Sequence, residues 1–369
     1  MLTVWAVDPQ RVRRGHLVSL ATTAVLKDAD VGTFQIVTPA HNDLAQRVVR
    51  GWRAIIQDGA TVLSGTILHS ELSAGGTELT FTGESDLRKL NIRITYPTPT
   101  QAAAAQTAEA KYSRSGPAET VIRDMIHANV GTGAITTRQE PGFTVTTSQG
   151  RGSTVKVATR FELMLEQARK LARSGGVTFD AVQENDNRII LRFRVPEDRS
   201  RKVRFTERNG GQDDGNAFSL DAPTVTTVIA GGQGLGTYRN IREYNRTGWV
   251  ERIEQFLDQS STDDDAEIKQ AADEVLDQGQ EAASATFTAQ ETPDLRFGVD
   301  YFLGDTVAVE IGAATITEPI RQAEITWDGH GRTVKLSLGD QDTTDSPDQK
   351  LVARIKKLEA LARREGAIK

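Results

Sequence analysis

Residues 224–239 read T-V-T-T-V-I-A-G-G-Q-G-L-G-T-Y-R, a β-branched run that ends in a glycine-rich loop. The glycines are Gly231, Gly232, Gly234 and Gly236, and they do not match the G-x-G-x-x-G spacing of a dinucleotide site. A P-loop requires Lys and then Ser or Thr after its last glycine, whereas threonine and tyrosine follow here. We therefore expect no phosphate or cofactor in this loop. It predicts a tight connection at a domain or subunit contact, with at least one glycine at positive φ.

The composition narrows the class of protein. The chain has 369 residues, a length typical of two or three domains. Its net charge of −6 gives no basic surface for duplex DNA, so we expect no sequence-specific nucleic-acid binding. It contains no cysteine, which excludes disulfides, zinc thiolates and thiol catalysis. We expect neither a signal peptide nor a membrane span, because no apolar run approaches the required length.

Short alternating segments and turn signals predominate, and they predict an α+β, β-rich multidomain protein. We expect two barrel-like or split β-domains, residues 1–99 and 207–345, flanking a small α+β domain at 100–206. The second β-domain is expected to carry an inserted helix at 263–283. Residues 346–369 are expected to form a C-terminal helix.

Local signals place several elements. A turn at Asp58 predicts a hairpin over 52–72, because Asp-Gly between apolar runs favours a tight reversal. A short helix is expected at about 84–90. A longer helix is expected to start at Thr159, which has capping-box spacing, and to end at Gly176.

The C-terminal helix carries an apolar stripe at Leu351, Ile355 and Leu358, with the spacing of a coiled-coil contact line. These three residues are the candidates for oligomerisation, and a trimeric coiled coil of the C-terminal helices is one form that it could take. Two heptads are too few to establish a coiled coil, and a helix docked on the core fits the spacing equally well.

No motif selects a catalytic, cofactor-binding or metal site. The five histidines are dispersed and none stands in a metalloprotease motif. They are His16, His41, His69, His127 and His330. The run Asp263, Asp264 and Asp265 is read as the amino end of a helix, where carboxylates complement the helix dipole. We therefore expect a protein that is not an enzyme. One alternative stays open, a glycosidase-type pair of carboxylates whose two members are distant in the sequence.

Several segments, in their order along the chain, resemble the hub proteins of bacteriophage tail tips. This family includes siphophage minor tail proteins and is related to the baseplate hubs of contractile tails and to type VI secretion spike proteins. The segments that carry the resemblance are residues 34–37 with 42–44, 51–67, 79–87 with 90–93, 228–239, and the G-D-x-V-x-V strand start at 304–309.

The resemblance implies a homotrimer in which each subunit contributes two similar β-domains to a ring. Such a structural hub adapts a sixfold tail tube to a threefold tip and surrounds the channel used in genome ejection. The implied partners are other copies of the chain, distal tail and tail tube proteins, the tape measure protein, and tip or fibre proteins. The implied location is the tail tip of the virion, after synthesis in the host cytoplasm. Lytic or receptor-binding regions appended to some hubs are not expected here.

Two other functions are compatible with the sequence. One is a tail-associated cell-wall hydrolase, whose carboxylates no motif identifies. The other is a carbohydrate- or receptor-binding tail protein that uses Trp5, Trp52, Trp249 or Trp327. Singly placed tryptophans more often belong to a core, so the structural hub is the leading interpretation.

Overall fold

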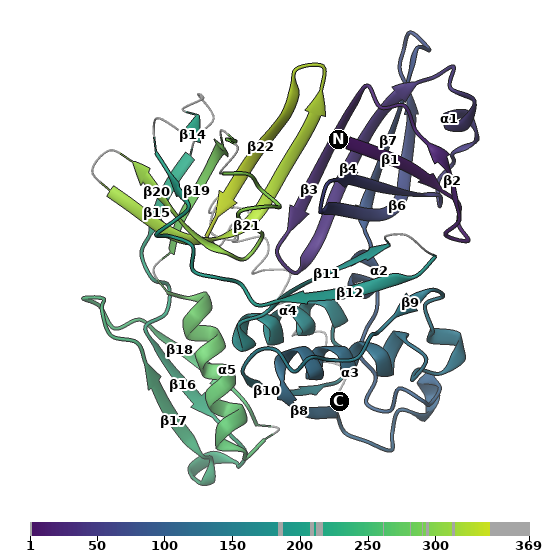
Figure 1. The fold of residues 1–369 in the computed structure, drawn as a ribbon. Coiled ribbons are helices and arrows are strands. Elements are labelled where there is room, and N and C mark those ends of the chain that lie inside the picture. The colour runs from purple at the N-terminus through teal and green to yellow at the C-terminus, as the bar shows by residue number, and fades with distance from the viewer. Residues whose placement is uncertain are drawn as a thin grey trace.

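The computed structural model describes residues 2–339 except 184–186, 207–209, 212–216, 261, 281, 290, 293–294 and 312–313. Figure 1 shows that this part of the chain is rich in β-structure, with helices gathered beside the sheets. The described strands form four sheets, of 14, 2, 3 and 3 strands, and they close no barrel. None of the described helices has the length and apolar character needed to cross a membrane.

The largest sheet is built from both ends of the chain and runs in the order β14-β19-β22-β21-β3-β4-β7-β6-β5-β1-β2. Its amino-terminal strands are β1 (Leu2–Val7), β2 (Arg13–His16), β3 (Ala21–Lys27), β4 (Asp30–Pro39), β5 (Arg53–Asp58), β6 (Thr61–Leu72) and β7 (Glu78–Ser85). Its later strands are β13 (Arg204–Phe205), β14 (Gly210–Gly211), β15 (Ala217–Asp221), β19 (Ala282–Ala289), β20 (Thr306–Ile311), β21 (Ala314–Asp328) and β22 (Gly331–Leu338).

The two halves of this sheet meet where β21 pairs with β3, which we call the β3–β21 junction. The pairing is antiparallel and runs from Gln322 opposite Lys27 to Trp327 opposite Thr22. One apolar core extends across it, with residues such as Phe34 beside others such as Leu336. The β-segments expected as two barrel-like or split domains thus share one open sheet. The paired strands lie about 300 residues apart in the sequence. Such pairing leaves no local sequence pattern, so it could not be predicted from the sequence.

The middle of the chain forms an α+β unit below the large sheet (Figure 1). Two helices, α3 (Ala118–Val130) and α4 (Met164–Gly175), pack with short strands around their own core. The strands are β8 (Tyr112–Pro117), β9 (Phe143–Thr144), β10 (Thr154–Thr159), β11 (Thr178–Gln183) and β12 (Ile189–Arg194). Short helices α1 (Asp43–Arg47) and α2 (Arg88–Asn91) and the 3-10 turns η1 (Ala103–Ala105) and η2 (Thr136–Arg138) lie in the connections.

Two helix boundaries differ from the sequence-based expectation. The helix α4 begins at Met164 and not at Thr159, because Thr159 is the last residue of β10 and Phe161 adopts a left-handed φ of 56°. The helix expected at about 84–90 is the single turn α2, because residues up to Ser85 extend β7. The end of α4 is confirmed, since Gly176 caps it at φ 66°.

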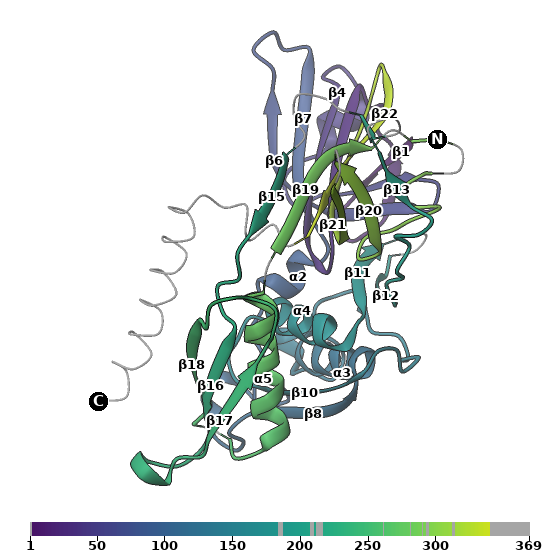
Figure 2. The ribbon, with the colours of Figure 1, turned by 90° about the vertical axis from the view of Figure 1, so that its left-hand side faces the viewer.

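A third unit, which we call the small unit (residues 222–280), lies between β15 and β19. Its strands β16 (Thr227–Gly231), β17 (Ile241–Asn245) and β18 (Glu254–Asp258) form a sheet in the order β17-β16-β18. The helix α5 (Asp265–Gln278) covers one face of this sheet and confirms the expected inserted helix. Figure 2 shows α5 between the small sheet and the α+β unit.

Candidate functional site

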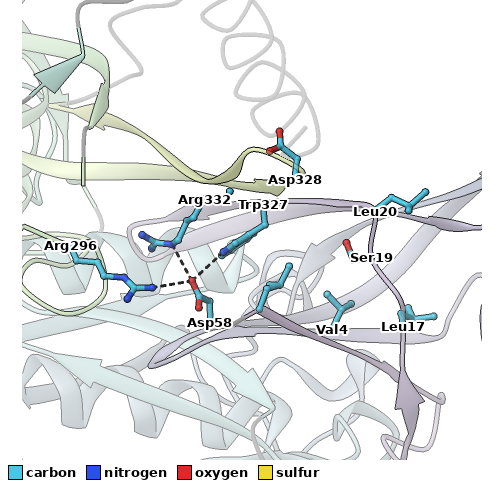
Figure 3. A pocket seen from close by; sticks show the side chains of 11 residues that line it. Val4, Leu17, Ser19, Leu20, Asp58, Arg296, Trp327, Asp328 and Arg332 are labelled. Atoms are coloured by element: carbon cyan, nitrogen blue, oxygen red, sulfur yellow. Dashed lines mark hydrogen bonds and ion pairs between the residues drawn. The ribbon is translucent and has the colours of Figure 1, made fainter. Parts of the chain in front are cut away.

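A cavity of about 480 Å³ opens at the β3–β21 junction, and strands from both ends of the chain line it. Leu2 and Val4 of β1 contribute one wall, and Trp327 of β21 with Arg332 of β22 contributes the other. Figure 3 shows Arg296, Trp327 and Arg332 pointing toward the carboxylate of Asp58, the last residue of β5. The cavity thus marks a place where the first and last segments of the chain are joined by charged groups.

Asp58 is the centre of this site, and its side chain is only 4% exposed. Its Oδ2 accepts a hydrogen bond from the Trp327 indole at 3.1 Å and pairs with Arg332 Nε at 3.1 Å. Arg296 approaches the same oxygen at 3.6 Å, and Glu291 also pairs with Arg332. The dashed lines of Figure 3 mark the contacts around Asp58.

Opposing effects set the pKa of Asp58. Burial acts to raise the pKa of the carboxyl, but the hydrogen bond from Trp327 and positive charges such as Arg332 outweigh burial. The net pKa is lowered, so the group is ionised at neutral pH. A buried carboxylate held by an indole and two arginines acts as a structural joint, because its oxygen is already occupied by donors.

A second joint connects the α+β unit to the later part of the large sheet. Asp305, which is 0% exposed, accepts from Arg194 Nη1 at 2.6 Å and from Arg199 Nε at 3.0 Å. It also accepts the backbone amides of Glu197 at 2.9 Å and Phe302 at 3.0 Å. This aspartate belongs to the G-D-x-V-x-V segment, so the motif supplies a buried ion-pair centre where β20 begins.

A third joint connects the same α+β unit to the amino-terminal strands. Arg53 of β5 donates to Asp86 at 2.7 Å and to the side chain of Gln183 in β11 at 3.2 Å. Ser64 of β6 donates to Asp86 at 2.6 Å and accepts from the Gln183 amide at 2.6 Å. No sequence motif identified Asp58, Asp86 or Asp305 as a functional residue. A charged residue at the end of an apolar strand is the one signal that could have found them.

The glycine-rich loop lies at one end of the small unit. Gly234 and Gly236 have φ of 118° and 56°, which confirms the predicted positive φ. Gly232 faces α5, since a side chain added there would meet the end of Ile268 at 2.8 Å. The amide of Gly232 donates to a backbone carbonyl at 2.8 Å, and the next amide does so at 2.9 Å. The predicted contact of this loop with another domain or subunit stays a prediction.

Gly231 has a separate physical role. The guanidinium of Arg239 occupies the space that a side chain at this position would fill, at 2.7 Å from the ideal Cβ. Arg239 donates to the carbonyls of Gly231 at 2.9 Å and Gly232 at 3.1 Å, and pairs with Asp258. It also lies over the Phe256 ring at 5.3 Å. The spacing from Gly231 to Arg239 therefore places the arginine side chain against the small sheet.

The remaining candidate residues fall in different places. Asp264 caps α5 by accepting the amides of Ala266 and Glu267, which confirms the helix-end interpretation of the aspartate run. No cluster of three or more His, Asp or Glu side chains that could hold a metal occurs among the described residues. Residues 346–369, which are expected to form a C-terminal helix with Leu351, Ile355 and Leu358, lie outside the described residues.

The four tryptophans do not gather on one surface. Trp327 is 8% exposed in the large core, and Trp52 packs against the same core. Trp5 lies against the His16 ring at 3.6 Å. Trp249 in the small unit is 38% exposed. The expected core placement is thus confirmed for Trp327, and Trp52 and Trp5 are partly buried side chains that pack against core clusters, whereas Trp249 does not follow the expectation.

Several solved structures share this fold. Their sequence identities to this chain are low, so the likeness concerns the fold alone. A 43 kDa tail protein of prophage MuSo2 from Shewanella oneidensis has a TM-score of 0.58 and 11% identity, over 93% of this chain and 99% of that one. A tail protein from Neisseria meningitidis has a TM-score of 0.54 and 13% identity, over 92% and 96%. Prophage tail protein gp18 from Listeria monocytogenes has a TM-score of 0.52 and 10% identity, over 98% and 99%.

These likenesses extend over almost the whole chain, so the described architecture is that of phage tail proteins. No curated protein matches the sequence. The model of one protein family matches residues 2–340, which includes every segment that carried the resemblance to phage tails. The chain belongs to the family of Siphovirus ReqiPepy6 Gp37-like proteins.

Proposed function

We propose that the protein is a structural hub at the tip of a phage tail. In this proposal three copies form a ring that adapts the sixfold tail tube to a threefold tip. The ring surrounds the channel through which the tape measure protein and the genome leave. Its other partners are distal tail or tube proteins above it and tip or fibre proteins below it.

The observation that carries the proposal is the single sheet made from both ends of the chain. Because β21 pairs with β3, the two β-segments stand side by side in a fixed orientation. Three copies of such a subunit would offer six neighbouring β-segments to a ring of six tube subunits. The buried joints at Asp58, Asp86 and Asp305 support this role, since an adapter that carries load needs its parts fixed to each other.

The charge of the chain supports a channel function. A net charge of −6 disfavours retention of DNA, because an acidic protein does not attract phosphates. The proposal includes no enzymatic step and no sequence-specific binding of nucleic acid. Three of the groups that line the cavity at the β3–β21 junction already have partners, since Asp58 contacts Trp327 and Arg332 and Arg332 also pairs with Glu291, which supports a structural role for that site.

Reconstitution with the tube protein of the same phage tests the proposal. The full-length chain is mixed with assembled tube, and the complex is measured by light scattering and imaged in negative stain. We expect three copies at one end of the tube and no release of muropeptides from purified cell walls. Six copies, a single copy, or saturable cell-wall turnover abolished by one Asp or Glu substitution would contradict the proposal.

A further inference from the structure

Two short segments of the α+β unit pair with each other and present apolar side chains to solvent. One segment is residues 92–96, which follow α2, and the other is residues 160–163, which connect β10 to α4. Ile94 pairs with Leu163 in an isolated antiparallel bridge. The amide of Phe161 donates to a backbone carbonyl of the first segment at 2.8 Å. The two segments therefore form a small ladder that fixes the positions of their side chains.

The outward side chains of this ladder are apolar, and we call them the Phe161 patch (Ile92, Ile94, Tyr96, Phe161 and Leu163). Ile92 is 57% exposed and Leu163 is 44% exposed. Ile94 and Phe161 are each more than a third exposed, and Tyr96 is partly buried. Single exposed apolar residues are common on protein surfaces, whereas a group of adjacent ones marks a contact site for another molecule.

The backbone of Phe161 displays its ring at a cost to the fold. Its φ of 56° lies in the left-handed region, which is disfavoured for a bulky side chain and open to glycine or asparagine. The ring lies outside the core of the α+β unit and meets the Tyr96 ring edge to face, with centroids 5.8 Å apart. A strained residue whose side chain stays in solvent is expected where the side chain acts in binding.

Two arginines flank the aromatic rings and lack carboxylate partners. The guanidinium carbon of Arg160 lies 4.8 Å from the centroid of the Phe161 ring, and that of Arg138 lies 3.5 Å from the centroid of the Tyr96 ring. Their hydrogen bonds go to backbone carbonyls and to one side-chain amide. Within the described part of the chain, neither guanidinium pairs with a carboxylate. Their positive charges are thus free to attract the carboxylates of a partner.

The neighbouring ion pairs do not cancel this positive charge. Lys89 and Arg93 share the single carboxylate of Glu140, at 2.5 and 3.3 Å. The carboxylate of Glu162, within the ladder, accepts from the Thr159 hydroxyl at 3.1 Å. Among these groups and the two flanking arginines, cations outnumber carboxylates. A partner with carboxylates is therefore favoured over a basic one.

We infer that the Phe161 patch binds a linear segment of another protein in which apolar side chains stand beside carboxylates. Apolar side chains of the segment cover Phe161, Ile94 and Leu163, and a carboxylate pairs with the exposed Arg160. Aromatic residues and arginines are the usual anchors of protein contacts. Because the ladder is short, it suits a segment of chain more than a broad domain surface. The inference adds a partner surface to the proposed hub and does not depend on the number of copies.

Peptide binding to the full-length protein tests the inference. The probes are overlapping peptides that cover the distal tail, tape measure and tip proteins of the same phage, and fluorescence polarisation measures their binding. We expect the bound peptides to combine apolar and acidic residues. Replacing their glutamates and aspartates by glutamine and asparagine should weaken binding about tenfold or more, and added salt should weaken the binding of the acidic peptides.

Two substitutions separate binding from folding. Phe161→Asn suits the left-handed φ, so it should keep or raise the thermal midpoint of unfolding while it weakens peptide binding about tenfold or more. Arg160→Gln should weaken the binding of an acidic peptide more than that of its neutral counterpart. Phe256→Asn and Arg114→Gln are the matched controls, since each alters an aromatic–arginine contact elsewhere in the chain, and neither should change peptide binding.

Several outcomes would overturn the inference. These are binding by no peptide, a preference for neutral or basic peptides, and binding that Phe161→Asn leaves unchanged. A lower thermal midpoint for Phe161→Asn would show that the ring serves the fold and not a partner. A change in the number of copies for this variant, without peptide binding, would assign the patch to a contact between copies. The proposed hub stands apart from these results, because the copy number of the parent chain on the tube tests it.

Discussion

Substitution of Asp58 by asparagine tests the joint at the β3–β21 junction. The change keeps the shape of the side chain and removes the charge that Arg332 and Trp327 share. A hydrogen bond to a charged group contributes about 1.5–3 kcal/mol, and breaking a buried ion pair costs about 3–5 kcal/mol. Asparagine can still accept from Trp327, and Glu291 still pairs with Arg332. We therefore expect Asp58→Asn to lower the free energy of unfolding by about 2–4 kcal/mol at pH 7.

The pH dependence of this effect follows from the lowered pKa of Asp58. The carboxyl has an unfolded-state pKa near 3.9, and in the folded protein its pKa lies below that value. Its stabilisation is complete above about pH 4 and is lost as the pH falls through the folded-state pKa. The difference in unfolding free energy between the parent chain and Asp58→Asn should therefore shrink as the pH falls below about 4.

Urea denaturation followed by tryptophan fluorescence measures both effects. Asp124→Asn is the matched control, because Asp124 is exposed on α3 and the chemical change is the same. This control should stay within about 0.5 kcal/mol of the parent chain. A loss below about 0.5 kcal/mol for Asp58→Asn at pH 7, or a loss that is unchanged at pH 3, would refute the assignment of Asp58 as a charged joint.

Four further predictions concern other parts of the chain. Gly234→Val should unfold the small unit, because φ is 118° and the new Cβ would meet a carbonyl oxygen at 2.5 Å, whereas Gly236→Asn, which meets nothing within 4 Å, should be tolerated in circular dichroism. Asp305→Asn should lower the free energy of unfolding by about 3 kcal/mol or more and increase protease cleavage between the α+β unit and the large sheet. The hydrogen bond to Asp264 raises the pKa of Lys156, so the charged lysine stabilises the contact with α5 below about pH 10.4 and this stabilisation is lost at higher pH. Hydrogen exchange of the α5 amides should therefore become faster as this stabilisation is lost. In Lys156→Met the additional loss of protection above that pH should be absent. Leu358→Asp should weaken trimerisation in light scattering while the β-structure stays folded, and normal assembly would show that the apolar stripe is not an interface.

Elements governed by nearby residues could be predicted from the sequence. The Asp58 turn gives the β5–β6 hairpin, Asp264 starts α5, and Gly176 ends α4, as expected. In each case the deciding interaction joins residues within a few positions of one another. The predicted start of α4 was wrong for a non-local reason. The hydroxyl of Thr159 forms a hydrogen bond with Thr95, 64 residues away, and its backbone belongs to β10.

The arrangement of the units could not be predicted, since it depends on contacts between distant residues. The antiparallel pairing of β3 with β21 and the joint between Asp58 and Trp327 connect opposite ends of the chain. The buried role of Asp305 depends on two arginines more than 100 residues earlier. The sequence of a strand shows which side chains are available for such contacts, but it does not show which distant strand or side chain they will contact.

The most direct test of the central claim is a reconstruction of the phage tail tip at a resolution that traces the chain. The proposed hub predicts three copies of this protein in a ring around the central channel, adjoining the last sixfold layer of the tube. In each copy the sheet that joins β3 to β21 should be continuous. Six copies, a single copy, or a position away from the channel would contradict the account.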